Sequence, residues 1–213
     1  MLIKDRRVSQ PAILAGCALA LLAMPSPAAA EWHFTPMIGL TFAGRTTLVD
    51  PQGGAGKRHG HVGGAVTLLG AGVFGAEVVG VFTPRFFQSD QSPLSDVKPV
   101  AIEGSRSVAL MANAVVTTPR RWTEYGLRPF VSAGLGLLHT SQTQAIKALP
   151  PLRTGMAGYN VGGGALGFLS ARTGVRFDLR YYSTIRGTVQ AGAAIGPARL
   201  RYWTASVGLV VRR

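Results

Sequence analysis

The chain has 213 residues, of which 47% are hydrophobic and only 15% charged, and its formal net charge is +13. Its mean hydropathy of +0.25 is high for a soluble domain and low for a protein that crosses a membrane with helices. Because the 28 glycines weaken helices along most of the chain, we expect one domain that is nearly all β.

The N-terminal segment has the three parts of a secretory signal peptide. A positively charged start (4–7) precedes an apolar stretch (12–24), and three alanines supply small residues for cleavage before Glu31. We therefore expect a signal peptide over residues 1–30 and a single barrel domain over 31–213.

The only cysteine, Cys17, lies inside this leader. It follows Leu14-Ala15-Gly16 and so resembles the lipoprotein box in which a cysteine carries a lipid. The apolar run continues through residues 18–24, which favours an ordinary signal peptide. Once Cys17 is removed, the chain has no thiol for a disulfide, a metal site or a nucleophile.

After the leader, apolar and polar residues alternate with the period of two that β-strands require. Strands are expected at residues 31–47, 61–69, 74–87, 105–118 and 127–141, in the hairpin 155–183 with its turn at 170–174, and at 199–211. In the second half of the hairpin, apolar side chains share one face and charged side chains the other (Val175, Phe177 and Leu179 against Arg176, Asp178 and Arg180). Such alternation is typical of soluble sandwiches as well as membrane barrels.

The lengths of the connections favour the membrane. Long loops (48–60, 88–104, 142–154 and 184–198) alternate with short turns, and outer-membrane barrels have an even number of strands, short periplasmic turns and longer external loops. The first and last strands can then pair, which removes the free sheet edges that lipid forbids. The predicted fold is an all-β, eight-stranded antiparallel up-and-down transmembrane β-barrel, expected to be a monomer.

Two segments resemble a known group of proteins. Residues 127–138 (LRPFVSAGLGLL) and 160–182 (NVGGGALGFLSARTGVRFDLRYY), together with the export signal, are similar to the small outer-membrane β-barrel proteins of the OmpA/OmpX-like kind. The resemblance implies a location in the cell outer membrane, contact with outer-membrane lipid and recognition by the barrel-assembly machinery. The chain departs from the group at Val211-Arg212-Arg213, where such barrels end on an aromatic residue.

Charged residues on the inward faces of the expected strands form the candidate site. The set is Glu77, Arg128, Arg176, Asp178 and Arg180. Unpaired burial costs several kcal/mol per ion, so we expect these groups to pair and to fill a lumen that is just wide enough for side chains. Glycines on the inner faces are expected to leave room for the long arginines (Gly134, Gly136, Gly162 and Gly164). Three arginines against two carboxylates leave one excess cation, so a narrow anion-preferring porin is the alternative.

A second alternative is an enzyme. The lipid A deacylases are barrels of similar layout in which a histidine lies two residues before a serine nucleophile, and His139 and Ser141 have this spacing. No orienting carboxylate follows them until Asp178. At the end of the seventh strand Tyr181 occupies the histidine position before Ser183, and a tyrosine is a poor base near neutral pH. A non-enzymatic protein is therefore favoured.

The basic charge points to an anionic partner. The arginines are scattered through apolar strands and do not form the basic, aromatic-bearing surface that nucleic acid requires. Basic external loops favour a partner such as lipopolysaccharide phosphate. His59 and His61 lie beside Lys57 and Arg58, which oppose a metal cation, so we expect a solvated loop end with no metal and no cofactor. The favoured function is a structural, adhesive or surface-interaction role with a filled lumen.

Overall fold

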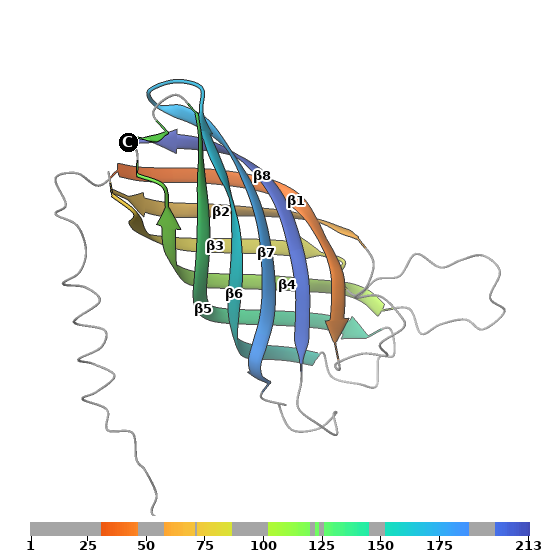
Figure 1. The fold of residues 1–213 in the computed structure, drawn as a ribbon. Helices are drawn as coiled ribbons and strands as arrows, with labels where there is room; N and C mark the ends of the chain where they lie inside the picture. The colour runs from red at the N-terminus through yellow and green to blue at the C-terminus, as the bar shows by residue number, and fades with distance from the viewer. Residues whose placement is uncertain are drawn as a thin grey trace, which may run out of the picture.

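The computed structural model describes residues 31–46, 58–70, 72–86, 102–119, 122–123, 126–144, 152–187 and 199–213. Eight antiparallel strands form a closed barrel in which each strand pairs with the next in the sequence and the last pairs with the first (Figure 1). They are β1 (Glu31–Thr46), β2 (His59–Leu69), β3 (Phe74–Pro84), β4 (Ile102–Thr117), β5 (Leu127–Gln144), β6 (Leu152–Phe168), β7 (Thr173–Gly187) and β8 (Leu200–Arg212). The predicted eight-stranded antiparallel barrel is confirmed.

No helix within the described residues is long and apolar enough to cross a membrane.

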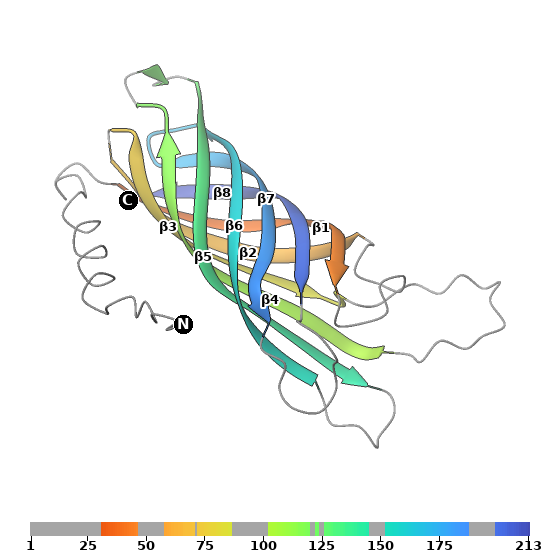
Figure 2. The ribbon, with the colours of Figure 1, turned by 60° about the horizontal axis from the view of Figure 1, so that its bottom comes forward.

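The two ends of the barrel differ in their connections. The short connections β2–β3, β4–β5 and β6–β7 lie at the end that holds the start of β1 and the C-terminus, which we call the turn end (Figures 1 and 2). The connections β1–β2, β3–β4, β5–β6 and β7–β8 lie at the opposite end, which we call the loop end. Three of them are longer than any connection at the turn end, but β5–β6 (145–151) is shorter than β4–β5 (118–126). The predicted alternation holds except at the loop expected over 142–154, which is shorter because β5 and β6 extend into it.

Strand β3 ends three residues earlier than its alternation predicts. Pro84 is its last residue, and Arg85 adopts a positive φ of 55°. Proline has no N–H to donate to a ladder, and a positive φ turns the chain out of the extended conformation. The strand therefore ends at Pro84 although apolar residues continue beyond it.

The seam between β1 and β8 closes the barrel along its whole length. Its register runs from His33 opposite Arg212 to Thr46 opposite Leu200. At the turn end, Trp32 N donates to Arg213 O at 3.1 Å and Arg213 N donates to Trp32 O at 2.9 Å. This closure leaves no strand edge to be solvated, which is the condition for a sheet in hydrocarbon.

Side chains are distributed in the reverse of a soluble protein. Large exposed apolar groups cover the outer face, among them Phe34, Ile38, Leu40, Val131, Leu135, Leu137, Phe177, Leu179, Val207 and Leu209. The inner face carries buried polar and charged groups, among them His33, Thr35, Thr41, Thr67, Glu77, Asn113, Asn160, Arg176, Asp178 and Arg180. An apolar exterior around a polar interior is the pattern of a transmembrane β-barrel.

Candidate functional site

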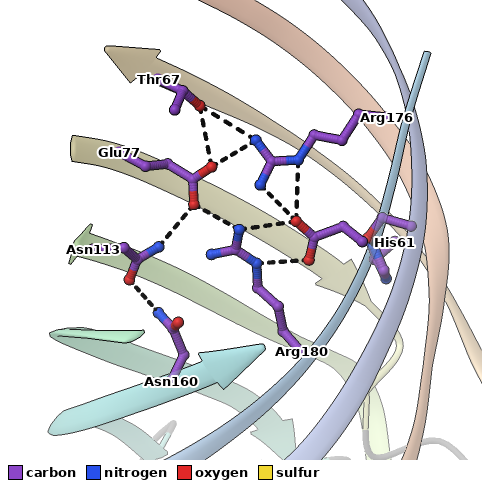
Figure 3. A network of polar contacts seen from close by, with 9 residues as sticks. His61, Thr67, Glu77, Asn113, Asn160, Arg176 and Arg180 are labelled. Carbon is purple, nitrogen blue, oxygen red and sulfur yellow. Dashed lines mark hydrogen bonds and ion pairs between the residues drawn. The ribbon is translucent and has the colours of Figure 1, made fainter. Parts of the chain in front are cut away.

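Four of the five charged residues expected in the lumen meet at its centre. Glu77 comes from β3, and Arg176, Asp178 and Arg180 come from β7, where period-two alternation places all three on the inner face. Their exposed fractions lie between 1% and 6%. Figure 3 shows Glu77 between the guanidinium groups of Arg176 and Arg180.

These four side chains form a closed ring of ion pairs, which we call the charge ring. Arg176 Nη1 lies 2.6 Å from Glu77 Oε2, and its Nη2 lies 2.6 Å from Asp178 Oδ2. Arg180 Nη2 lies 2.6 Å from Glu77 Oε1, and its Nε lies 2.6 Å from Asp178 Oδ1. Each carboxylate therefore bridges both arginines, and the ring has no net charge. Short charge-assisted bonds of this kind are the strongest that side chains make.

Neutral side chains complete the coordination of Glu77. Thr67 Oγ1 donates to Glu77 Oε2 at 3.1 Å, and Asn113 Nδ2 donates to Glu77 Oε1 at 2.9 Å. Asn160 Nδ2 in turn donates to Asn113 Oδ1 at 2.7 Å (Figure 3). Neither asparagine was among the charged residues that the sequence pattern predicts for the lumen. Their position in the sequence could have indicated this role, because a buried amide on the inner face of an apolar strand requires a hydrogen-bonding partner.

Arg128 lies apart from the charge ring and requires a correction to the expected set. It is on the inner face of β5 but at the turn end, where its Nε donates to Thr118 O at 2.9 Å. Its Nη2 donates to Gly70 O at 3.2 Å and to Gly72 O at 3.1 Å. The guanidinium thus ties together two short connections, and the cation expected in excess is not part of the central cluster.

Apolar layers enclose the charge ring on both sides. On the turn-end side, inward residues of β2, β4, β5, β6 and β8 form a cluster of Leu69, Val115, Phe130, Leu166 and Val210. On the loop-end side a larger cluster contains Met37, Val79, Val81, Phe86, Met111, Leu138, Met156, Tyr182 and Tyr202. There Tyr182 stacks on Tyr202 with ring centroids 5.0 Å apart, and Phe86 packs edge-on against Tyr202 at 5.2 Å.

Inward glycines give the larger side chains their space. A Cβ added at Gly162 would lie 2.5 Å from Cγ of Arg180, as the sequence analysis expects for an arginine neighbour. The other three expected glycines accommodate different groups. Gly134 lies against Asn113, Gly136 against Met111, and Gly164 against Phe130 and the backbone of β7.

A second polar cluster lies in the lumen nearer the loop end. His61 Nε2 lies 2.9 Å from Ser206 Oγ, and its Nδ1 lies 3.1 Å from Thr41 Oγ1. Thr41 also bonds Thr83 at 3.1 Å between hydroxyl oxygens. His61 is only 3% exposed, so the expectation of a solvated loop end is wrong for this residue. Among the described residues no group of three or more histidine, cysteine, aspartate or glutamate side chains could hold a metal ion.

Of the residues considered for catalysis, His139 and Ser141 lie on β5, where Ser141 is buried, whereas Tyr181 and Ser183 lie on β7. His139 is exposed on β5, and Ser183 is on β7 opposite Arg201 of β8. Tyr181 belongs to a row of aromatic side chains, with ring centroids 5.2 Å from Trp203 and 6.4 Å from Tyr159. The buried carboxylates of the described residues are bound in the charge ring. Glu124, the nearest carboxylate before His139 in the sequence, and the leader cysteine Cys17 lie outside the described residues.

Comparisons with known proteins identify a fold. No protein-family model matches the sequence, and no curated protein matches it. The outer-membrane protein OprG from Pseudomonas aeruginosa is similar in structure, with a TM-score of 0.52, 13% identity and coverage of 87% of this chain and 96% of that chain. Neisserial surface protein A is similar with a TM-score of 0.50, 12% identity and coverage of 84% and 97%. The chain thus has the fold of the small eight-stranded outer-membrane β-barrels, and the resemblance predicted from its sequence is confirmed.

Proposed function

We propose that the chain is an integral protein of the outer membrane whose lumen is closed to solutes and whose structural or adhesive role is exerted at the cell surface by its loop end. The observation that carries this proposal is the neutral charge ring enclosed by two apolar layers. A transport function needs a continuous polar path along the axis, whereas apolar clusters lie on both sides of the charge ring.

Energetics support a closed lumen. Removing one partner of a buried ion pair costs about 3–5 kcal/mol, and displacing Arg180 to open a path would separate it from both Glu77 and Asp178. The anion-preferring pore required an excess cation in the lumen. Arg128 was that cation, and it binds backbone carbonyls at the turn end instead.

The outer-membrane location is supported by the apolar outer face and by the likeness in fold to outer-membrane barrels. The signal peptide over residues 1–30 lies outside the described residues and stays a prediction. We further propose that the chain is a monomer and that the barrel-assembly machinery inserts it.

Conductance tests the closed lumen. Purified wild-type protein in planar bilayers is expected to give no steady current steps above the protein-free bilayer. Replacing all four members of the charge ring by alanine is expected to increase conductance, because these side chains occupy the lumen. Arg128→Ala is the matched control, since it removes an inward arginine outside the ring and should leave the barrel closed. Steady anion-selective steps from the wild type would establish the pore alternative.

Each conductance sample is first run on a gel with and without boiling, because a folded membrane barrel migrates differently from its unfolded chain. Fractionation of cells that express the full chain then tests the location. A soluble periplasmic protein would contradict the proposal.

Lipid A profiles test the absence of enzymatic activity. Expression of the chain is expected to leave the acyl chains of lipid A unchanged. The deacylase-like alternative would be established if wild-type expression removed an acyl chain from lipid A and expression of His139→Ala or Ser183→Ala did not.

A further inference from the structure

Two arginines face each other on the outside of the seam. Arg45 of β1 lies directly opposite Arg201 of β8 in the register, and both are exposed. On the other side of Arg201, the register places Ser183 of β7 opposite it. Within the described part of the chain, the side chains of Arg45 and Arg201 have no hydrogen bond or ion pair. Two like charges directly opposite on neighbouring strands repel each other.

A β-bulge creates this arrangement. The inward residues of β1 have odd numbers up to Thr41, so continued alternation would place residue 45 in the lumen. The register shifts between Phe42 and Arg45, where Ala43 adopts a φ of 52°. Beyond this shift Thr46 is buried and Arg45 is exposed. Bulges commonly re-aim a side chain in this way, and here the bulge brings a second guanidinium beside Arg201.

The pair lies beside a row of aromatic side chains on the same outer face. Phe42 pairs with Trp203 across the seam, and Trp203 pairs with Tyr181 across the next strand junction. The rings of Tyr181 and Trp203 are in contact, with centroids 5.2 Å apart. Aromatic girdles of membrane barrels mark the interface between hydrocarbon and headgroups. Arg201 lies two residues beyond Trp203 toward the loop end, so an aromatic girdle at this row would put Arg201 at the level of the lipid headgroups.

We propose that Arg45 and Arg201 bind a phosphate of lipopolysaccharide in the outer leaflet, with Ser183 as an additional hydrogen-bond donor. Guanidinium groups bind phosphate with paired, charge-assisted hydrogen bonds, and a phosphate between them replaces their mutual repulsion by attraction. The aromatic row then contacts the sugar and the first part of the acyl chains. This inference rests on the proposed function, because it requires the loop end to lie at the cell surface.

The direction of the side chains favours a lipid over a soluble polyanion. Arg45 and Arg201 project from the outer face of the barrel, beside residues that contact hydrocarbon, whereas a soluble sulfated polysaccharide would approach the loop end along the barrel axis. A polysaccharide partner is therefore an outcome of the test and not the proposal.

Binding is measured with purified, refolded full-length barrel and two probes, a short-sugar lipopolysaccharide and the same lipid with its phosphates removed. The double variant Arg45→Gln with Arg201→Gln is expected to bind the phosphorylated lipid about tenfold more weakly than the wild type, because two charge-assisted contacts are lost. The dephosphorylated lipid is expected to bind the wild type and the variant equally weakly.

Arg106→Gln is the matched control, since Arg106 is also exposed but lies on β4, away from the seam. It should leave binding near the wild-type value. An equal loss in Arg106→Gln, no loss in the double variant, or equal affinity for both lipids would overturn the proposal. Tight binding of heparin that depends on the same two arginines and displaces the lipid would do so as well.

A separate measurement distinguishes failure of this inference from failure of the proposed function. Arg58 is exposed where β2 begins at the loop end, and the described residues contain no cysteine. Arg58→Cys protein on intact cells is expected to react with a membrane-impermeant thiol reagent. Labelling without phosphate-dependent lipid binding would reject only the lipid site, whereas absence of labelling would reject the orientation on which the site depends.

Discussion

The guanidinium groups at the centre of the barrel are buried and paired with carboxylates, whereas those on its seam are exposed and face each other. Arg176 and Arg180 are buried, and each contacts both carboxylates of the charge ring. Arg45 and Arg201 are exposed and lie opposite each other. The inner pair is satisfied by the chain itself and fixes the lumen, whereas the outer pair is left with capacity for an anion from outside. The charge ring is therefore neutral, whereas the seam holds two positive charges opposite each other.

Removing one inner carboxylate should have the largest effect. Glu77→Gln leaves Arg176 and Arg180 with a single carboxylate, and breaking a buried ion pair in this way is expected to lower the free energy of unfolding by about 3–5 kcal/mol. Denaturant unfolding of the barrel in lipid vesicles, followed by gel migration, measures the change. A loss below about 1 kcal/mol would mean that the ring contributes no more than an exposed pair does.

A paired replacement sharpens this prediction. Glu77→Met together with Arg180→Met removes one charge of each sign and leaves the Arg176–Asp178 pair in place. Replacing a buried ion pair by apolar residues of similar volume is often close to neutral, so the double variant should recover most of the stability that Glu77→Gln loses. A double variant as unstable as the single one would show that shape, and not charge balance, sets the cost.

Crowding the same ring should have an intermediate effect. Gly162→Ala places a Cβ against the backbone oxygen of Leu179 and 2.5 Å from Cγ of Arg180, and overpacking of a filled interior typically costs about 1–3 kcal/mol. Gly60→Ala is the matched control, because a Cβ there meets nothing within 4 Å. Equal unfolding free energies for the two variants would contradict the close packing of Arg180 against β6.

The sequence alone predicts which charged side chains of β7 face the lumen, but not which residues they contact. Alternation on β7 places Arg176, Asp178 and Arg180 on one face, because side-chain direction in a regular strand depends only on parity. The level of a side chain along the barrel axis depends on the stagger between strands, which no local pattern reports. For that reason the partnership with Glu77 and the separate position of Arg128 required the structure.

The outward position of Arg45 beside Arg201 could not be predicted from the sequence for a different reason. Parity assigns residue 45 to the lumen, and only the bulge at Phe42–Arg45 turns it outward. A one-residue shift of register reverses the face of every following side chain. The sequence does not indicate the bulge at Ala43, since alanine rarely adopts a positive φ.

Removing the outer pair should change stability little and in the opposite direction. Arg45→Gln with Arg201→Gln relieves repulsion between like charges on neighbouring strands, a contribution of about 0.2–1 kcal/mol. In vesicles without lipopolysaccharide, the double variant is expected to be slightly more stable than the wild type, and the difference should shrink as salt screens the charges. A clear destabilisation would show that the two guanidinium groups have partners within the chain.

A partly exposed ion pair at the turn end gives the smallest expected effect. Glu31 Oε2 lies 3.3 Å from Arg212 Nη1, with side chains 29% and 16% exposed, and such pairs contribute about 0–1 kcal/mol because water and salt screen them. Glu31→Gln should therefore lower the unfolding free energy by less than about 1 kcal/mol, measured in the same vesicles as Glu77→Gln. The two variants make the same chemical change, an acid to its amide opposite an arginine. A ratio near one between their effects would mean that water reaches the charge ring as freely as it reaches the turn end, and the lumen would then not be closed.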